Sequence, residues 1–216
     1  MKDVIGKFSE DALLKEMNES ATKGLRKWES KVVKEHFPRK GKVLDIGCGG
    51  GREAIPLAKL GYEVFAVDVA DKQIEIAKEN AQREQVQITF AQSDGVSIPF
   101  RDARFDVIVL WVQVLGNMPS RTEQLRLLQS CKDSLAPAGL VSASVHERDY
   151  CRQDAPKYTD ENWLSPWGRG QLRYQLFTKD SLDSLVKEAG FQTVLTEVPA
   201  SLKAVIYTIA RRAEDS

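Results

Sequence analysis

The sequence of 216 residues lacks several features that mark particular classes of protein. Its three cysteines, Cys48, Cys131 and Cys151, show no C-x-x-C spacing, which argues against a zinc site and against a disulfide framework. No apolar run approaches the roughly 18 residues of a membrane span, and the first residues lack the apolar core of a secretion signal. We therefore expect a cytoplasmic protein with no membrane partner and no bound metal.

An excess of charge of one sign is also missing. The 31 basic side chains balance the 31 acidic ones, so the formal net charge is zero. A protein that binds nucleic acid normally carries an excess of Lys and Arg, because the phosphate backbone is a polyanion. DNA is therefore not an expected partner, although a local basic patch is not excluded.

What is present is an alternation of strand-like and helix-like segments. Short apolar runs such as "KVLDIG" and "FDVIVLWV" predict buried strands, and the segments between them show helical spacing of apolar residues. Five such alternations predict a doubly wound α/β fold whose sheet is mostly parallel. The last two apolar runs, "FQTVLTEV" and "KAVIYTIA", are separated by about four residues, which is too short for a parallel crossover. We therefore expect a seven-stranded sheet with an antiparallel last strand.

The stretch "VLDIGCGGG" places a carboxylate, Asp45, at the mouth of a glycine-rich loop. Gly49, Gly51 and Ala54 fit the G-x-G-x-x-A pattern of dinucleotide-binding proteins, which is weak when it stands alone. A carboxylate at this point would repel a pyrophosphate. It would attract a ligand that carries an ammonium and a sulfonium, as S-adenosylmethionine does. Asp45 therefore favours S-adenosylmethionine over a dinucleotide.

Two further aspartates follow the next two predicted strands. Asp68 lies where ribose hydroxyls are bound in nucleoside-binding sheets, and Asp94 is placed to accept a hydrogen bond from an adenine amino group. Asp68 supports a nucleoside ligand without choosing between the two candidates. The alternative for each of these aspartates is that it only caps a helix.

The segments "VLDIGCGGGREAIPLAKLGYEVFAVDVA", "SDGVSIPFRDARFDVIVLWVQVL" and "LAPAGLVSASVH" resemble the motifs of class I S-adenosylmethionine-dependent methyltransferases. The resemblance covers roughly residues 41–146. It implies a Rossmann-like fold, S-adenosylmethionine as cofactor, and transfer of its methyl group to an acceptor. By this resemblance the glycines would line the methionine moiety, Asp68 the ribose and Asp94 the adenine. The cofactor-binding residues would be Asp45, Gly47, Gly49, Gly51, Asp68, Val69, Asp94, Gly95, Leu110 and Trp111.

On this interpretation the chain is a single domain with four parts. Residues 1–40 would form a helical cap, 41–146 the cofactor-binding core, 147–177 an inserted lid, and 178–216 a closing helix with the antiparallel strand pair.

The segment after the fourth predicted strand, "LWVQ", carries neither a nucleophilic Pro-Cys pair nor a cluster of metal ligands. Methyl transfer from a sulfonium can proceed by in-line placement of the acceptor, with the site supplying mainly orientation. The leading hypothesis is therefore a methyltransferase with a small-molecule acceptor. The alternatives are methylation of a protein or RNA and, with less support, a nicotinamide-dependent oxidoreductase. The oligomeric state is not indicated.

The lid, residues 147–177, is too long for a plain connection in a compact domain and is rich in aromatic residues. We expect its aromatic rings to face the ligand cleft; the alternative is that they only fasten the loop to the sheet edge. His146, at the end of the fifth predicted strand, is a candidate general base or a structural histidine. Trp28 would either cover the cofactor or belong to the core. The candidate substrate-binding residues are Tyr150, Tyr158, Trp163, Trp167, Arg173 and Tyr174.

Overall fold

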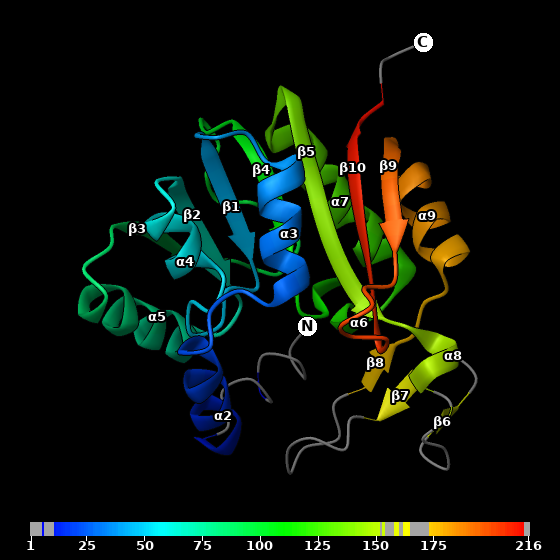
Figure 1. Cartoon of the computed structure of the whole chain (residues 1–216), viewed down its shortest axis with the longest axis horizontal. Coiled ribbons are helices and arrows are strands. Elements are labelled where there is room, and N and C mark those ends of the chain that lie inside the picture. Colours follow the sequence, from blue (N-terminus) through cyan, green and yellow to red (C-terminus); the bar gives the residue numbers. More distant parts are fainter. Residues whose placement is uncertain are drawn as a thin grey trace.

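The computed structural model describes residues 6, 11–151, 153, 158–159, 162–164 and 173–213. Seven strands form one sheet in the order β3-β2-β1-β4-β5-β10-β9, in which β10 runs antiparallel to both of its neighbours (Figure 1). The strands of this sheet are β1 (Lys42–Ile46), β2 (Glu63–Asp68), β3 (Ile88–Gln92), β4 (Phe105–Leu110), β5 (Leu135–His146), β9 (Phe191–Glu197) and β10 (Val205–Arg212). The predicted α/β fold with its antiparallel last strand is confirmed.

Helices cover both faces of the sheet (Figure 1). The described helices are α2 (Asp11–Ala21), α3 (Lys27–His36), α4 (Ala54–Lys59), α5 (Asp71–Arg83), α6 (Val114–Asn117), α7 (Arg121–Ser134), α8 (Arg148–Cys151) and α9 (Lys179–Glu188). Helices α3 and α4 pack on one face, and α7 and α9 pack on the other. Because successive residues of a strand point to opposite faces, Leu44 of β1 joins one core and Val43 the other. A parallel strand buried on both faces needs the continuous apolar runs seen in the sequence.

Local sequence explains where two of the helices begin. Ser120 caps α7, since its side chain accepts a hydrogen bond from the backbone N–H of Glu123. Pro56 lies in the first turn of α4, where a proline removes at most one backbone hydrogen bond of the helix and is tolerated.

Some elements were not predicted. Helices α6 and α8 are single turns, and a small antiparallel sheet is formed by β6 (Tyr158–Thr159), β7 (Asn162–Leu164) and β8 (Arg173–Gln175). This small sheet and α2 both lie at the end of the main sheet where the parallel strands finish (Figure 1). The loops that could hold a ligand therefore meet at this end.

Within the described ranges, no helix is long and apolar enough to cross a lipid bilayer. Over the same part of the chain, no three His, Cys, Asp or Glu side chains are grouped to hold a metal ion.

Candidate functional site

The glycine loop between β1 and α4 folds against the end of β2. The backbone N–H of Gly47 donates to the carbonyl of Val67 at 2.8 Å. The Asp68 carboxylate accepts from the N–H of Gly49 at 2.9 Å and from the N–H of Ala70 at 3.0 Å. Burial raises the pKa of Asp68, and these backbone donors oppose the shift. Asp68 therefore fixes the shape of the loop as well as standing at its rim.

Gly47 has a backbone φ of 77°, in the left-handed region that a side chain rarely adopts. A Cβ at this position would lie 2.7 Å from Cγ2 of Val114, in α6. The loop is thus bare of side chains at the point where the segment after β4 approaches it.

Asp45 is 2% exposed at the end of β1. Its Oδ2 atom has no hydrogen-bond partner among the described residues. Burial, followed by the nearby Glu53 carboxyl, raises the pKa of Asp45 well above its usual range, while Arg52 works in the opposite direction. A buried acceptor without a partner is costly, and a ligand that brings a cationic donor would satisfy it.

A buried ion network joins the glycine loop to α3. The Arg52 guanidinium donates to both carboxylate oxygens of Glu29, each at 2.8 Å, and to the carbonyl of Gly24 at 2.9 Å. It also binds the carboxyl of its neighbour Glu53. Glu29 is fully buried, and burial followed by repulsion from Glu29 raises the pKa of Glu53 to about 7, against the attraction of Arg52.

This network was not predicted from the sequence. Arg52 and Glu53 follow the glycines directly, which is a visible local feature. Their partner Glu29 lies 23 residues before Arg52, and no spacing rule predicts that pairing.

The residues predicted on the adenine side differ from Asp68 in their exposure and in their hydrogen bonds. Asp94 is exposed and lies two residues beyond the end of β3. Its Oδ1 accepts from the N–H of Val96 at 2.8 Å and from that of Ser97 at 2.6 Å, and these bonds lower its pKa. Asp94 therefore accepts hydrogen bonds within its own loop, where no helix begins, and its contact with adenine stays a prediction. Gly95 follows it with a φ of 88°, and Val69, just after Asp68, is half-buried.

Leu110 and Trp111 lie at the end of β4, as expected, but their side chains are buried in the core. The Trp111 indole donates to the Ser142 hydroxyl at 2.9 Å and stacks on Phe37. Trp28 packs edge-on against Trp111 and belongs to the same core. If Leu110 and Trp111 touch the cofactor, backbone atoms must make the contact.

Just beyond Trp111, which follows β4, two residues adopt positive φ angles, 56° at Val112 and 73° at Gln113. Such conformations are strained, above all for a β-branched residue, and they cluster at functional sites. The Ser144 hydroxyl accepts from the N–H of Val112 at 3.0 Å and helps to hold the bend. Gln113 is 5% exposed, and its Oε1 has no partner among the residues described. This buried acceptor was not predicted from the sequence, because neither Val112 nor Gln113 is a residue type that favours turns.

His146 ends β5 and is 7% exposed. Burial lowers its pKa to about 4, although a hydrogen bond with the backbone of Ala204 opposes the shift. Its ring meets the half-buried ring of Tyr174 edge-on, with centroids 4.9 Å apart. At neutral pH His146 is therefore an uncharged imidazole and a weak base.

The C-terminal part of the lid is anchored beside the segment after β4. Gln175 of β8 accepts a hydrogen bond from Gln124 at 2.8 Å and donates to the carbonyl of Met118 at 3.2 Å. The backbone carbonyl of Gln175 also approaches Gly116 of α6. The edge strand of the lid thus lies next to the strained bend.

The remaining lid candidates are placed only in part. Tyr158, Trp163 and Arg173 are backbone members of the small sheet, in which Trp163 pairs with both Tyr158 and Tyr174. Trp167 lies outside the described residues. Tyr150 is 42% exposed on α8 and lines a cavity of about 360 Å³.

Comparisons with known proteins agree with this geometry. A family model described as a methyltransferase domain matches residues 17–196. The ubiquinone biosynthesis O-methyltransferase of Cereibacter sphaeroides is 32% identical over 155 residues, which are 71% of this chain and 61% of that protein. The putative methyltransferase YqeM of Bacillus subtilis is 29% identical over 117 residues, 54% of this chain and 47% of that protein. The chain thus spans less than two thirds of these relatives.

Solved structures show the same fold. A structure of S-adenosylmethionine-dependent methyltransferases from Methanosarcina mazei aligns with a TM-score of 0.75 at 18% identity, covering 89% of this chain and all of that one. The glycopeptide N-methyltransferase MtfA in complex with S-adenosylmethionine aligns with a TM-score of 0.69 at 17% identity, covering 95% of this chain and 96% of that one. The chain therefore belongs to the class I methyltransferases, the Rossmann-like enzymes that use S-adenosylmethionine.

Proposed function

We propose that the chain transfers the methyl group of S-adenosylmethionine to a small-molecule acceptor. The observation that carries the proposal is the buried Asp45 oxygen that has no partner among the described residues, beside a glycine loop whose shape Asp68 fixes. The residues present fit the cofactor, because Asp45 suits a cationic group and Asp68 suits paired ribose hydroxyls. When bound, S-adenosylmethionine supplies an electrophilic methyl group on its sulfonium.

The names of the relatives support a small acceptor. One is a ubiquinone biosynthesis O-methyltransferase and another a glycopeptide N-methyltransferase, so both oxygen and nitrogen acceptors occur among similar proteins. We assign neither substrate to this chain, because the identities are 32% and 17% and the chain covers only 61% of the first protein.

The acceptor would lie between the strained bend after β4, His146 and the lid. Gln113 presents a buried carbonyl oxygen there, which can accept a hydrogen bond from the hydroxyl or amine that is methylated. His146, with its pKa lowered to about 4, is poorly matched to remove a proton at neutral pH. Orientation of the acceptor, rather than strong base catalysis, would thus be the main contribution of these residues.

Replacing Gln113 by leucine should lower kcat/KM for the acceptor about tenfold, as expected for the loss of one hydrogen bond of roughly 1.5 kcal/mol. The dissociation constant of S-adenosylhomocysteine should stay within twofold. Gln129→Leu makes the same chemical change on the exposed face of α7 and should leave both values unaltered.

The assay would follow radiolabelled methyl groups from S-adenosylmethionine into a panel of phenols and amines, and into protein and RNA fractions of a cell extract. Labelling of only the protein or RNA fraction would contradict the small-molecule proposal. An unchanged kcat/KM in Gln113→Leu would remove Gln113 from the acceptor site.

A further inference from the structure

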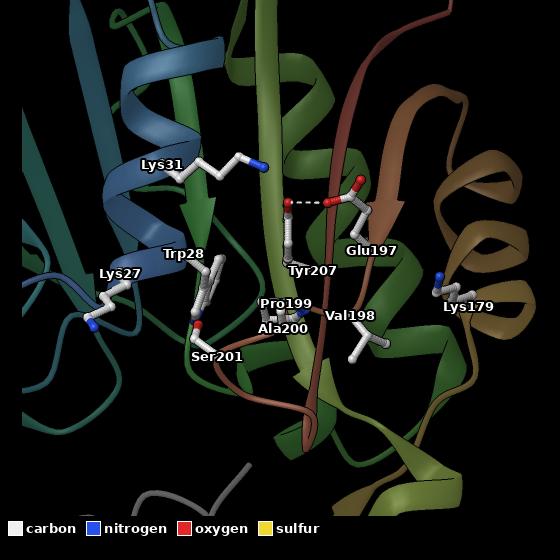
Figure 2. Close-up of a pocket in the computed structure, with 10 residues that line it drawn as sticks. All are labelled: Lys27, Trp28, Lys31, Lys179, Glu197, Val198, Pro199, Ala200, Ser201 and Tyr207. Atoms are coloured by element: carbon white, nitrogen blue, oxygen red, sulfur yellow. Dashed lines mark hydrogen bonds between the residues drawn. The ribbon is translucent and has the colours of Figure 1, made fainter.

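Figure 2 shows the lining of a second cavity, which has a volume of about 560 Å³. It opens between α3, the connection from β9 to β10, and the start of α9. No residue of the glycine loop, and neither Asp45 nor Asp68, lines it. Its volume falls in the range of roughly 300–1,000 Å³ that is typical of small-molecule sites. We call it the α3 groove.

The buried floor of the α3 groove contains a hydrogen-bond donor for which the described part of the chain offers no acceptor. Trp28 stacks on Tyr207 with ring centroids 5.0 Å apart. Trp28 Nε1 is buried and has no partner among the described residues. In Figure 2 this nitrogen points toward Ser201, another residue of the lining. An unpaired buried N–H is costly, so an acceptor atom from a ligand would be stabilised there.

The groove that contains this donor is lined by more positive than negative charge. The lining contains three lysines, Lys27, Lys31 and Lys179, against one carboxylate, Glu197. Glu197 accepts a hydrogen bond of 2.8 Å from the Tyr207 hydroxyl, so one of its oxygens is already engaged. Lys31 also lies 3.8 Å from the carboxylate of Glu35, but both side chains are exposed and such pairs are weak.

The lysines are not equally placed. Figure 2 shows the Lys31 side chain extending from α3 across the groove toward Tyr207, with Lys179 on the opposite wall at the start of α9. The ammonium of Lys27 points away from the centre. Lys31 and Lys179 are therefore the two cations best placed to act on a bound group.

We propose that the α3 groove binds a small organic anion, a carboxylate or a phosphate ester. Its oxyanion accepts the Trp28 indole N–H, and the ammonium groups of Lys31 and Lys179, which line other parts of the same groove, attract its negative charge. Its apolar part rests against the wall formed by Val198, Pro199 and Ala200. This site is separate from the cofactor loop and does not depend on which acceptor is methylated.

The indole N–H of Trp28 gives a direct test by nuclear magnetic resonance. Benzoate and phenyl phosphate are the probes, and benzamide is the uncharged control. A saturable shift of the Trp28 indole resonance is expected with one or both anions and not with benzamide. The anion with the lower dissociation constant indicates whether the groove prefers a carboxylate or a phosphate ester.

Charge variants make the assignment specific. The double variant Lys31→Gln/Lys179→Gln should raise the dissociation constant of the bound anion at least fivefold. Lys59→Gln, which removes an exposed lysine paired with Glu84 outside the groove, should leave it unchanged. Trp28→Phe identifies the resonance; if that variant does not fold, triple-resonance assignment replaces it. No saturable shift with either anion, an equal response to benzamide, or an unchanged constant in the double variant would overturn the proposal.

Discussion

Replacing Arg52 by methionine is expected to lower the free energy of unfolding by about 3–5 kcal/mol, the usual cost of removing one partner of a buried ion pair. Arg52 holds Glu29, which is fully buried, through two hydrogen bonds of 2.8 Å, and it also binds Glu53. Without the guanidinium both carboxyls are left buried and uncompensated. Urea denaturation at constant pH measures the change.

The loss of unfolding free energy in Arg52→Met should be larger at pH 8 than at pH 5. Burial has already raised the pKa of Glu53 to about 7, so at pH 5 this carboxyl can hold a proton and avoid an unpaired charge. At pH 8 the Glu53 carboxyl of the variant loses its proton and becomes a buried carboxylate without a counter-ion. The stability that the protonated form contributed is then lost.

Two controls separate this network from a general effect of removing an arginine. Arg121→Met breaks an exposed pair with Glu188 and should cost less than about 1 kcal/mol. The double variant Arg52→Met/Glu29→Gln should recover part of the loss, because one orphaned charge is removed together with its partner. An Arg52→Met protein as stable as the parent would show that the network does not hold α3 to the loop.

Replacing Asp68 by alanine is expected to weaken binding of S-adenosylhomocysteine about 10- to 150-fold. Hydrogen bonds to a charged group contribute roughly 1.5–3 kcal/mol, and 1.4 kcal/mol corresponds to a factor of ten. Two causes act together here. The variant removes the acceptor for the ribose hydroxyls, and it frees the N–H groups of Gly49 and Ala70 that set the shape of the loop.

Calorimetric titration of folded Asp68→Ala measures this loss. Asp71→Ala, which removes an exposed carboxylate in the first turn of α5, is the matched control and should bind as the parent does. Asp68→Asn keeps one acceptor oxygen, and its dissociation constant should lie between those of Asp68→Ala and the parent. Equal dissociation constants for Asp68→Ala and the parent would mean that the ribose is bound elsewhere.

The fold was predictable because its determinants are local. Buried parallel strands need continuous apolar runs, and β1 and β4 carry them. The short connection before β10 requires antiparallel pairing, and the structure shows it. The position of the glycine loop and of Asp68 was also predictable, because the carboxyl ends of parallel strands meet at one edge of the sheet.

The rest of the site depends on contacts between distant segments. The pairing of Glu29 with Arg52 is set by how α3 lies on the sheet, and no pattern in either segment predicts it. The bend at Val112 and Gln113 requires positive φ at two residues that do not favour it, so only the surrounding structure can impose it. The short strands β6, β7 and β8 lack the length and alternation from which strands are recognised.

The charge on Asp45 gives cofactor binding a defined pH dependence. Burial raises the pKa of this carboxyl in the free protein, so at low pH it is neutral and attracts no cation. As the pH rises through that raised pKa the carboxylate forms, and the ammonium of the ligand gains its partner. Affinity should therefore increase with pH. Asp45→Asn should bind more weakly and show less of this dependence.

Calorimetric titration of the parent protein with S-adenosylhomocysteine and with NAD, repeated across a pH series, tests the assignment of the glycine loop most directly. We expect one-to-one binding of S-adenosylhomocysteine that weakens as the pH is lowered, and no heat of binding with NAD. Binding of NAD without binding of S-adenosylhomocysteine would contradict the assignment.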